Sequence, residues 1–149
     1  MTIIEGLNDD LRDAIRSKDS LRRTVLRTLL SEIANAKIAK RSDLTEEEIL
    51  VVITKQSQQR KDSIEAFADA GRKDLEDKER LELELISTYL PEQLSEEEVQ
   101  DIIDGVLLEV GATGPSDMGK VMGIVMPKVR GRTDGKIVNS IVVSKLKEL

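Results

Sequence analysis

The chain has 149 residues, a length typical of one domain or of two small ones, and carries a formal net charge of −6. It contains no histidine and no cysteine, which excludes imidazole metal ligands, thiol nucleophiles, disulfides and catalytic units built on histidine. Charged residues make up 35%, and the aromatic residues are one phenylalanine and one tyrosine. We therefore expect amphipathic helices and little base stacking.

Up to Pro91, every periodic segment has a helical period, with apolar residues at i, i+3, i+4 and i+7. The polar stretch TKQSQQRKDS has no apolar face, so we expect it to project into solvent or to pair with another polar surface. The expected helices are, in order, 2–17, 19–41, a third that begins at the capping box of Thr45 and Glu48, and a fourth that Pro91 ends.

Past Pro91 the same signals predict three shorter helices. Ser95 and Glu98 form a second capping box, and no segment alternates with the period of a strand. The helices are expected from Ser95 to Gly111, from Ser116 or Asp117 to Gly131, and from Thr133 to the end. The sequence thus predicts an all-α fold, with a four-helix N-terminal domain over 1–91 and a three-helix tail domain over 95–149.

The net charge hides an uneven distribution along the chain. Residues 1–41 carry +3, residues 42–111 carry −13 and residues 112–149 carry +4. Charge blocks of this kind are usually the solvated faces of helices. A basic end is also what contact with nucleic acid needs.

The segment DMGKVMGIVMPKVRG places Gly119 and Gly123 one helical turn apart, as close packing against another helix requires. On that interpretation Gly119→Leu or Gly123→Leu destabilises the tail by about 1–3 kcal/mol through overpacking. Met118, Met122 and Met126 form a parallel row. Such a row either lines a binding groove or fills a core, and the core interpretation is favoured.

Five basic residues surround the loop that follows this segment: Lys120, Lys128, Arg130, Arg132 and Lys136. A glycine-containing loop that leads into a helix N-terminus offers backbone amides to an anion, and flanking Lys and Arg side chains add charge. These residues are therefore a candidate RNA- or phosphate-binding surface, although the spacing is not that of a P-loop. The alternative, which pattern alone favours, is a solvated loop with basic residues at helix ends.

A second basic patch is expected at Arg16, Arg22, Arg23 and Arg27, with Arg12 beside it. These residues would line one end of the first helical pair. The favoured alternative is salt bridging to the acidic residues of the middle segment, because acids outnumber bases overall.

A resemblance to the YqeY-like family, part of the GatB/YqeY superfamily, covers nearly the whole chain. It rests on the segments KDSLRRTVLRTLLSEI, SQQRKDSIEAFADAGRKDL, STYLPEQLSEEE and SDMGKVMGIVMPKVRGRTDGKIVN. The resemblance implies a helical N-terminal domain and a tail similar to that of the B subunit of the glutamine-dependent aspartyl/glutamyl-tRNA amidotransferase. A similar module is appended to some glutaminyl-tRNA synthetases, and in both settings it assists tRNA binding.

The resemblance therefore implies that residues 95–149 are a tRNA-binding tail. The family label is carbon–nitrogen ligase activity with glutamine as amide donor, but the catalytic regions of the amidotransferase are absent from this chain. We expect an accessory module without catalysis, cofactor or metal of its own, whose partners are tRNA and amidotransferase or aminoacyl-tRNA synthetase components. The alternative is a protein-interaction module that docks on a translation or amidotransferase component. Neither DNA nor a membrane is an expected partner, and the absence of a signal peptide or an apolar spanning run predicts a cytoplasmic location.

Overall fold

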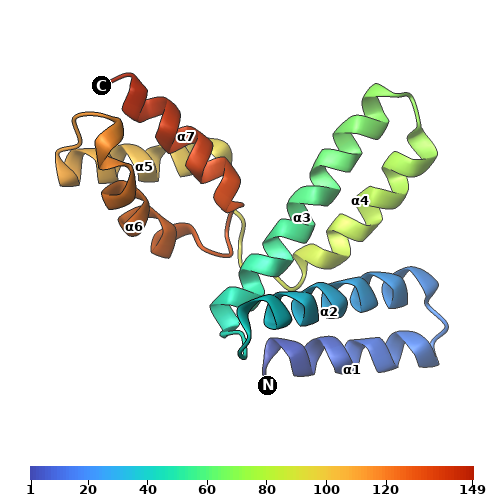
Figure 1. Ribbon diagram of the computed structural model, residues 1–149. Helices are drawn as coiled ribbons and strands as arrows, with labels where there is room; N and C mark the ends of the chain where they lie inside the picture. The colour runs from blue at the N-terminus through green and yellow to red at the C-terminus, as the bar shows by residue number, and fades with distance from the viewer. The chain divides into compact units, whose positions relative to one another are not determined.

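The computed structural model describes residues 1–149, and it contains helices without any β-strand. The prediction of an all-α fold is confirmed. The helices are α1 (Ile3–Arg16), α2 (Ser20–Lys40), α3 (Glu46–Asp69), α4 (Lys73–Ser87), α5 (Glu96–Val110), α6 (Met118–Val129) and α7 (Gly135–Lys147), with a short 3₁₀ turn, Pro115–Asp117, before α6 (Figure 1).

Side-chain caps fix where several of these helices begin. Both predicted capping boxes form, because Thr45 and Ser95 each accept a hydrogen bond from the third helical amide and the glutamates Glu48 and Glu98 bond back to the cap residue. Glu48 also accepts a hydrogen bond from the Lys40 ammonium group. This bond and the hydrogen bonds with Thr45 lower the pKa of Glu48 to about 2. The carboxylate therefore stays ionised while it holds the start of α3.

The chain divides into two compact units, Met1–Pro91 and Glu92–Leu149. In the first unit, α1 runs antiparallel to α2, and α3 forms an antiparallel hairpin with α4 (Figure 1). The buried side chains of this unit form one core, in which all four helices take part: Leu7, Ala14, Val25, Leu26, Leu29, Ile33, Ile49, Ile53 and Ile86.

The polar middle of α3 is not wholly exposed, since it packs against α4. Gln56 and Ser57 are buried there. One turn further, Arg60 Nε lies 2.9 Å from Glu82 Oε2 and 3.5 Å from Glu79 Oε2, and the Glu82 side chain is only 8% exposed. Of the two outcomes expected for this stretch, pairing with another polar surface is the one observed.

Tyr89, just after the C-terminal end of α4, connects this end to α1 and α2 through polar contacts. Its hydroxyl donates a short hydrogen bond to Asp10 on α1, and Asp10 also pairs with Arg22 on α2 at 3.4 Å. Burial and the hydrogen bond to the Asp10 carboxylate raise the pKa of the Tyr89 phenol, so it remains a donor at neutral pH. This contact fixes the chain just before the first unit ends at Pro91.

The second unit, which we call the tail, has a separate core between α5, α6 and α7. It is built from the buried residues Val99, Ile103, Val106, Val121, Val125, Val129, Val138, Val142 and Leu146. Met118, Met122 and Met126 pack against this core, which confirms the core interpretation of the methionine row.

The glycines of α6 do not pack against another helix as the sequence predicted. No heavy atom lies within 4 Å of the position that a Cβ would occupy at Gly119 or Gly123. The prediction of overpacking by Gly119→Leu or Gly123→Leu is therefore wrong. The reason is helical phase: the valines at 121, 125 and 129 face the core, and the glycine stripe lies on the opposite side of α6.

Candidate nucleic-acid interface

The five basic residues of the candidate interface lie on α6, on the loop after it and on the first turn of α7. Lys120, Lys128, Arg130 and Lys136 are exposed, and Arg132 is half-buried. Lys128, Arg130, Arg132 and Lys136 thus lie around the loop between α6 and α7, whereas Lys120 lies at the opposite end of α6. The five residues do not have the same role.

Lys120 has a local structural contact. Its ammonium group lies 3.5 Å from the carbonyl oxygen of Val110, in the last turn of α5. A positive charge at that position stabilises the negative end of the helix dipole. For this residue the structure supports the alternative interpretation, a basic side chain at a helix end.

Arg132 is bound to the segment that leads into α5. Its Nε donates a hydrogen bond to the carbonyl oxygen of Glu92 at 3.2 Å, and its carbonyl oxygen accepts one from the Leu94 amide at 2.9 Å. The Gln93 side chain donates to the carbonyl oxygen of Gly131, which is buried and has a φ of 80°. The loop is thus fastened to residues 92–94, and a substitution of Arg132 would disturb that attachment.

Most amides at the N-terminus of α7 are already bonded to the cap residue Asp134. The Asp134 carboxylate accepts a hydrogen bond from the Lys136 amide at 2.9 Å, and the Asp134 carbonyl oxygen accepts from Ile137 and Val138. The cap residue therefore occupies three of the first four amides of α7, from Lys136 to Val138, in the expected anion cradle. A phosphate at this place would be bound mainly by side chains.

Lys128 and Lys136 remain as exposed cations without an acidic partner. Lys136 is the second residue of α7, at the positive end of the helix dipole, where a positive charge is unfavourable for the helix. Local helix stability therefore does not account for a lysine at 136. Attraction of an external anion would account for it.

The outward face of α6 carries glycines beside the basic residues. Gly119, Gly123 and Pro127 are spaced by four residues and are all exposed. Glycine in an exposed helix interior costs about 1 kcal/mol relative to alanine. Without Cβ atoms at positions 119 and 123, this face allows another molecule to approach the helix backbone closely there, and the sequence did not indicate it because the glycines were assigned to internal packing.

The tail as a whole is acidic, which the division of the sequence into charge blocks concealed. Residues 92–149 hold seven basic and ten acidic side chains, and seven of the acids lie between Glu92 and Glu109. The positive charge of the tail is thus local to α6, its following loop and α7, whereas α5 is negative. We call the surface of Lys120, Lys128, Arg130, Arg132 and Lys136 the basic edge. An anion would be attracted to this edge and repelled by α5.

The second basic patch, on α1 and α2, forms only local ion pairs. Arg12 pairs with Asp9 at 2.8 Å and Arg22 with Asp10, so neither uses an acid of the middle segment. Arg16, Arg23 and Arg27 form no ion pair. The favoured explanation of these arginines, salt bridging to the middle segment, is therefore not what the structure shows.

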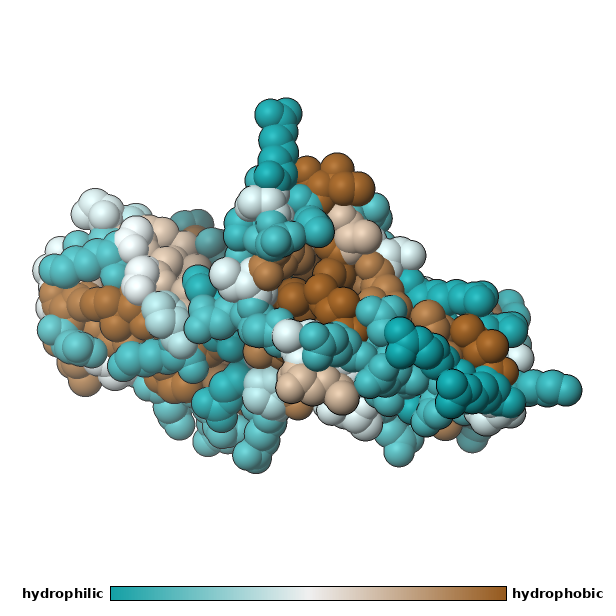
Figure 2. Space-filling view, turned by 90° about the horizontal axis from the view of Figure 1, so that it is seen from below, coloured by the Kyte–Doolittle hydropathy of each residue, from teal (hydrophilic) through white to brown (hydrophobic).

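The surface outside these patches is mixed. Figure 2 shows hydrophobic residues exposed among hydrophilic ones, and Leu108 and Ile38 are 84% and 74% exposed. Acidic side chains nowhere gather in a group of three or more that is arranged to hold a metal ion. None of the helices combines the length and the apolar content that crossing a bilayer requires.

These features define a two-unit helical protein with a basic edge on its C-terminal unit. A family model described as "Yqey-like protein" matches residues 4–146. The chain belongs to this YqeY-like family, as the resemblance predicted.

Two fungal relatives are described as "Altered inheritance of mitochondria protein 41, mitochondrial". The protein of Pyrenophora tritici-repentis is 32% identical over 145 residues, which are 96% of this chain and 77% of that protein. The protein of Lachancea thermotolerans is 39% identical over 116 residues, which are 76% of this chain and 62% of that one. The match thus leaves more than a third of the Lachancea protein uncovered.

An archaeal relative has a different description. It is a glutamyl-tRNA(Gln) amidotransferase subunit of Thermococcus gammatolerans, which is 48% identical over 60 residues. Those residues are 38% of this chain and 10% of the archaeal protein. The chain therefore has partial similarity to an amidotransferase component in addition to its family membership.

The fungal relatives correct the prediction of a cytoplasmic location. Both are named as mitochondrial proteins, so that prediction is wrong. It rested on the absence of a signal peptide and of a spanning run. Neither absence indicates a compartment, because organelle targeting uses short amphipathic segments that differ from both signals.

Proposed function

We propose that the tail binds folded tRNA through side chains at its basic edge and acts as an accessory module without catalysis of its own. The observation that carries the proposal is the placement of Lys128 and Lys136 as exposed cations without acidic partners, on the two helices that flank the basic loop. The similarity to the archaeal amidotransferase supports it, since 60 matched residues are about the length of the tail and that protein is named for a tRNA substrate.

The contacts in this proposal are made by side chains to phosphates. Asp134 already accepts hydrogen bonds from the Lys136, Ile137 and Val138 amides, so Lys128, Arg130 and Lys136 side chains supply the charge. The tail offers no aromatic ring for base stacking, because Phe67 and Tyr89 both lie in the first unit. Recognition therefore depends on the shape of the RNA and on its backbone, with weak sequence preference.

The first test exchanges charge at the two unpaired lysines. Lys128→Glu with Lys136→Glu is expected to weaken binding of labelled tRNA about tenfold or more at low salt, measured by fluorescence anisotropy. For the parent, a plot of the logarithm of the binding constant against the logarithm of the salt concentration should have a slope between about −2 and −5. For the double variant this slope should be closer to zero by about 2. Both changes should leave the melting temperature nearly unchanged, because both side chains are exposed.

A matched control makes the same charge change in the first unit. Lys55 and Lys61 are exposed on α3 and form no ion pair, so Lys55→Glu with Lys61→Glu should bind tRNA like the parent. An equal loss of tRNA affinity in the control would show that the total charge of the protein, and not the basic edge, is responsible. If the parent does not bind tRNA at all, the RNA proposal fails and the protein-interaction module takes its place.

The second test separates stability from binding at the glycine face. Gly123→Ala is expected to stabilise the tail by about 0.5–1 kcal/mol, because alanine favours the helix and its Cβ meets no atom. The same Cβ should weaken tRNA binding if the RNA backbone approaches α6 closely. Thermal unfolding and anisotropy on the same samples measure both effects.

Gly105 supplies the control for this test. It is an exposed glycine in the middle of α5, and its Cβ position is equally open. Gly105→Ala should therefore stabilise the tail by a similar amount and leave tRNA binding unchanged. Tighter or unaltered binding by Gly123→Ala would show that the RNA does not contact this face.

A further inference from the structure

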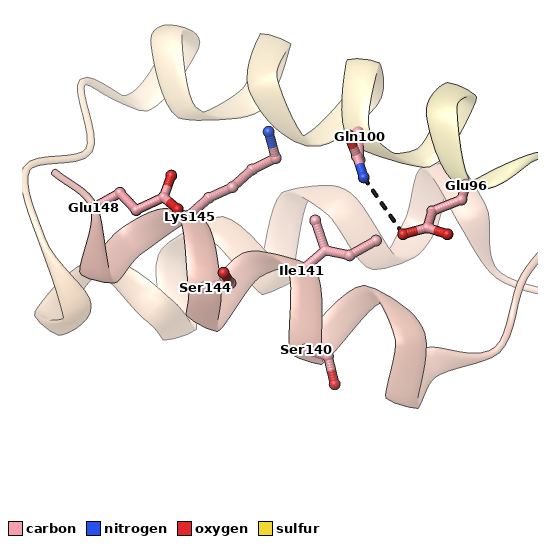
Figure 3. Close-up of a pocket in the computed structure, with 7 residues that line it drawn as sticks. All are labelled: Glu96, Gln100, Ser140, Ile141, Ser144, Lys145 and Glu148. Atoms are coloured by element: carbon pink, nitrogen blue, oxygen red, sulfur yellow. Dashed lines mark hydrogen bonds between the residues drawn. The ribbon is translucent and has the colours of Figure 1, made fainter.

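A groove of about 340 Å³ lies between α5 and α7 in the tail (Figure 3). Ile141 lies near its middle, with Glu96 toward one end and Glu148 toward the other. The lining residues are Glu96, Gln100, Ser140, Ile141, Ser144, Lys145 and Glu148. None of the basic residues proposed to contact tRNA lines it, so the groove is a separate feature of the tail.

The groove has unneutralised negative charge. Lys145 is its one basic residue, and the Lys145 ammonium lies 2.7 Å from Asp104 Oδ1 on α5. Glu96 accepts a long hydrogen bond of 3.5 Å from Gln100, and neither Glu96 nor Glu148 forms an ion pair. Two carboxylates therefore border the groove without a cationic partner, and they repel phosphate groups.

An arginine side chain matches this combination of groups. Its methylene groups would pack on Ile141, which the groove leaves half-exposed, while the guanidinium group reaches the Glu96 carboxylate at one end of the groove. The guanidinium group has five N–H donors in a planar fork, which suits a glutamate carboxylate. Gln100 uses its amide N–H toward Glu96 and thus keeps its carbonyl oxygen available as a further acceptor. A lysine has a point charge and fills fewer of these acceptors.

We propose that the groove between α5 and α7 binds an arginine side chain of a partner protein. The partner segment is basic, because it must approach a helix that carries most of the acids of the tail. The groove and the basic edge then allow one small unit to contact a protein and an RNA at different places. The proposal does not depend on RNA binding, since it uses other residues.

The experiment is a titration of the full chain, labelled with ¹⁵N, with the peptide acetyl-Gly-Arg-Gly-amide. Saturable shifts are expected at the amides around Glu96–Gln100 and Ser140–Glu148. Glu96→Gln should weaken the affinity about tenfold, and Glu148→Gln, at the other end of the groove, should weaken it less. Because both glutamates are exposed, the spectrum of each variant should otherwise remain that of the folded parent.

Two controls distinguish the groove from general attraction. Glu97 and Glu109 are exposed on α5 and do not line the groove, so Glu97→Gln with Glu109→Gln should bind the peptide like the parent. Acetyl-Gly-norleucine-Gly-amide, which has an apolar stem without charge, should bind more weakly. The proposal is overturned by an equal loss in the control variant, by equal binding of the norleucine peptide, by absence of saturable shifts, or by tighter binding of spermidine than of the arginine peptide.

Discussion

Arg60→Met is expected to lower the free energy of unfolding by about 3–5 kcal/mol, which is the usual cost of leaving a buried charge without its partner. Arg60 is the cation that lies between two glutamates inside the α3–α4 hairpin, and its side chain is 19% exposed. Methionine keeps much of the volume and removes the charge, so Glu79 and Glu82 would repel each other without compensation. Denaturant unfolding at pH 7 measures the loss.

Lys61→Met provides the control, because Lys61 is the next residue on α3, is exposed and forms no ion pair. Lys61→Met should change the free energy of unfolding by less than about 0.5 kcal/mol. If both variants lowered the free energy of unfolding by similar amounts, the charge of Arg60 would contribute no stability beyond that of its methylene groups.

The same cluster has an excess carboxylate, and this gives a pH dependence. Burial and the neighbouring Glu82 raise the pKa of Glu79 above its ordinary 4.5. The folded state then holds the proton more tightly than the unfolded state does. The stabilising contribution of Glu79 is therefore complete below pH 4.5 and is lost as the pH rises through the raised pKa. Glu79→Gln, which is neutral at every pH, should be more stable than the parent at pH 7.

The measurement is the free energy of unfolding of the parent and of Glu79→Gln between pH 4 and pH 8. The difference between them should grow as the pH rises. A constant difference across this range would show that Glu79 has no raised pKa in the folded protein.

The second large effect concerns the two separate cores. Ile53 and Ile103 are both fully buried, the first in the core of Met1–Pro91 and the second in the core of the tail. Replacing either by alanine should cost about 2–5 kcal/mol through the lost methylene groups and the cavity left behind. We expect each loss to remain within the unit that carries the substitution.

Native-state hydrogen exchange tests this expectation residue by residue. Ile53→Ala should reduce protection of amides in the first unit and leave those of α5–α7 unchanged, and Ile103→Ala should do the reverse. Ile38→Ala is the control, because Ile38 is 74% exposed and should alter neither unit. Equal loss of protection in both units from one variant would show that the chain unfolds as a single cooperative domain.

Much of the fold follows from local signals in the sequence. The caps at Thr45 and Ser95 and the turn glycine at Gly111 mark helix ends because they satisfy backbone groups within a few residues. The apolar periodicity identifies which side of each helix is buried. These signals act over one or two helical turns, so the all-α class and the approximate helix bounds could be predicted without a structure.

The candidate site could be predicted only in part. The sequence identified the basic residues from Lys120 to Lys136, since charge and spacing are visible in it. It did not show that Lys120 lies at the end of α5, that Arg132 is bonded to the segment before α5, or that Asp134 accepts hydrogen bonds from amides in the first turn of α7. The first two of these contacts join residues 10 and 40 positions apart, beyond the reach of local pattern.

The sequence by itself therefore determined the helices, their inner faces and the membership in the YqeY-like family. Only the tertiary structure decided that Gly119 and Gly123 face outward and that Arg60 lies between two glutamates of α4. The physical reason is that periodicity gives the angle of a side chain around its own helix and not the identity of what lies opposite. That identity depends on how helices distant in sequence pack against one another, and no local interaction encodes it.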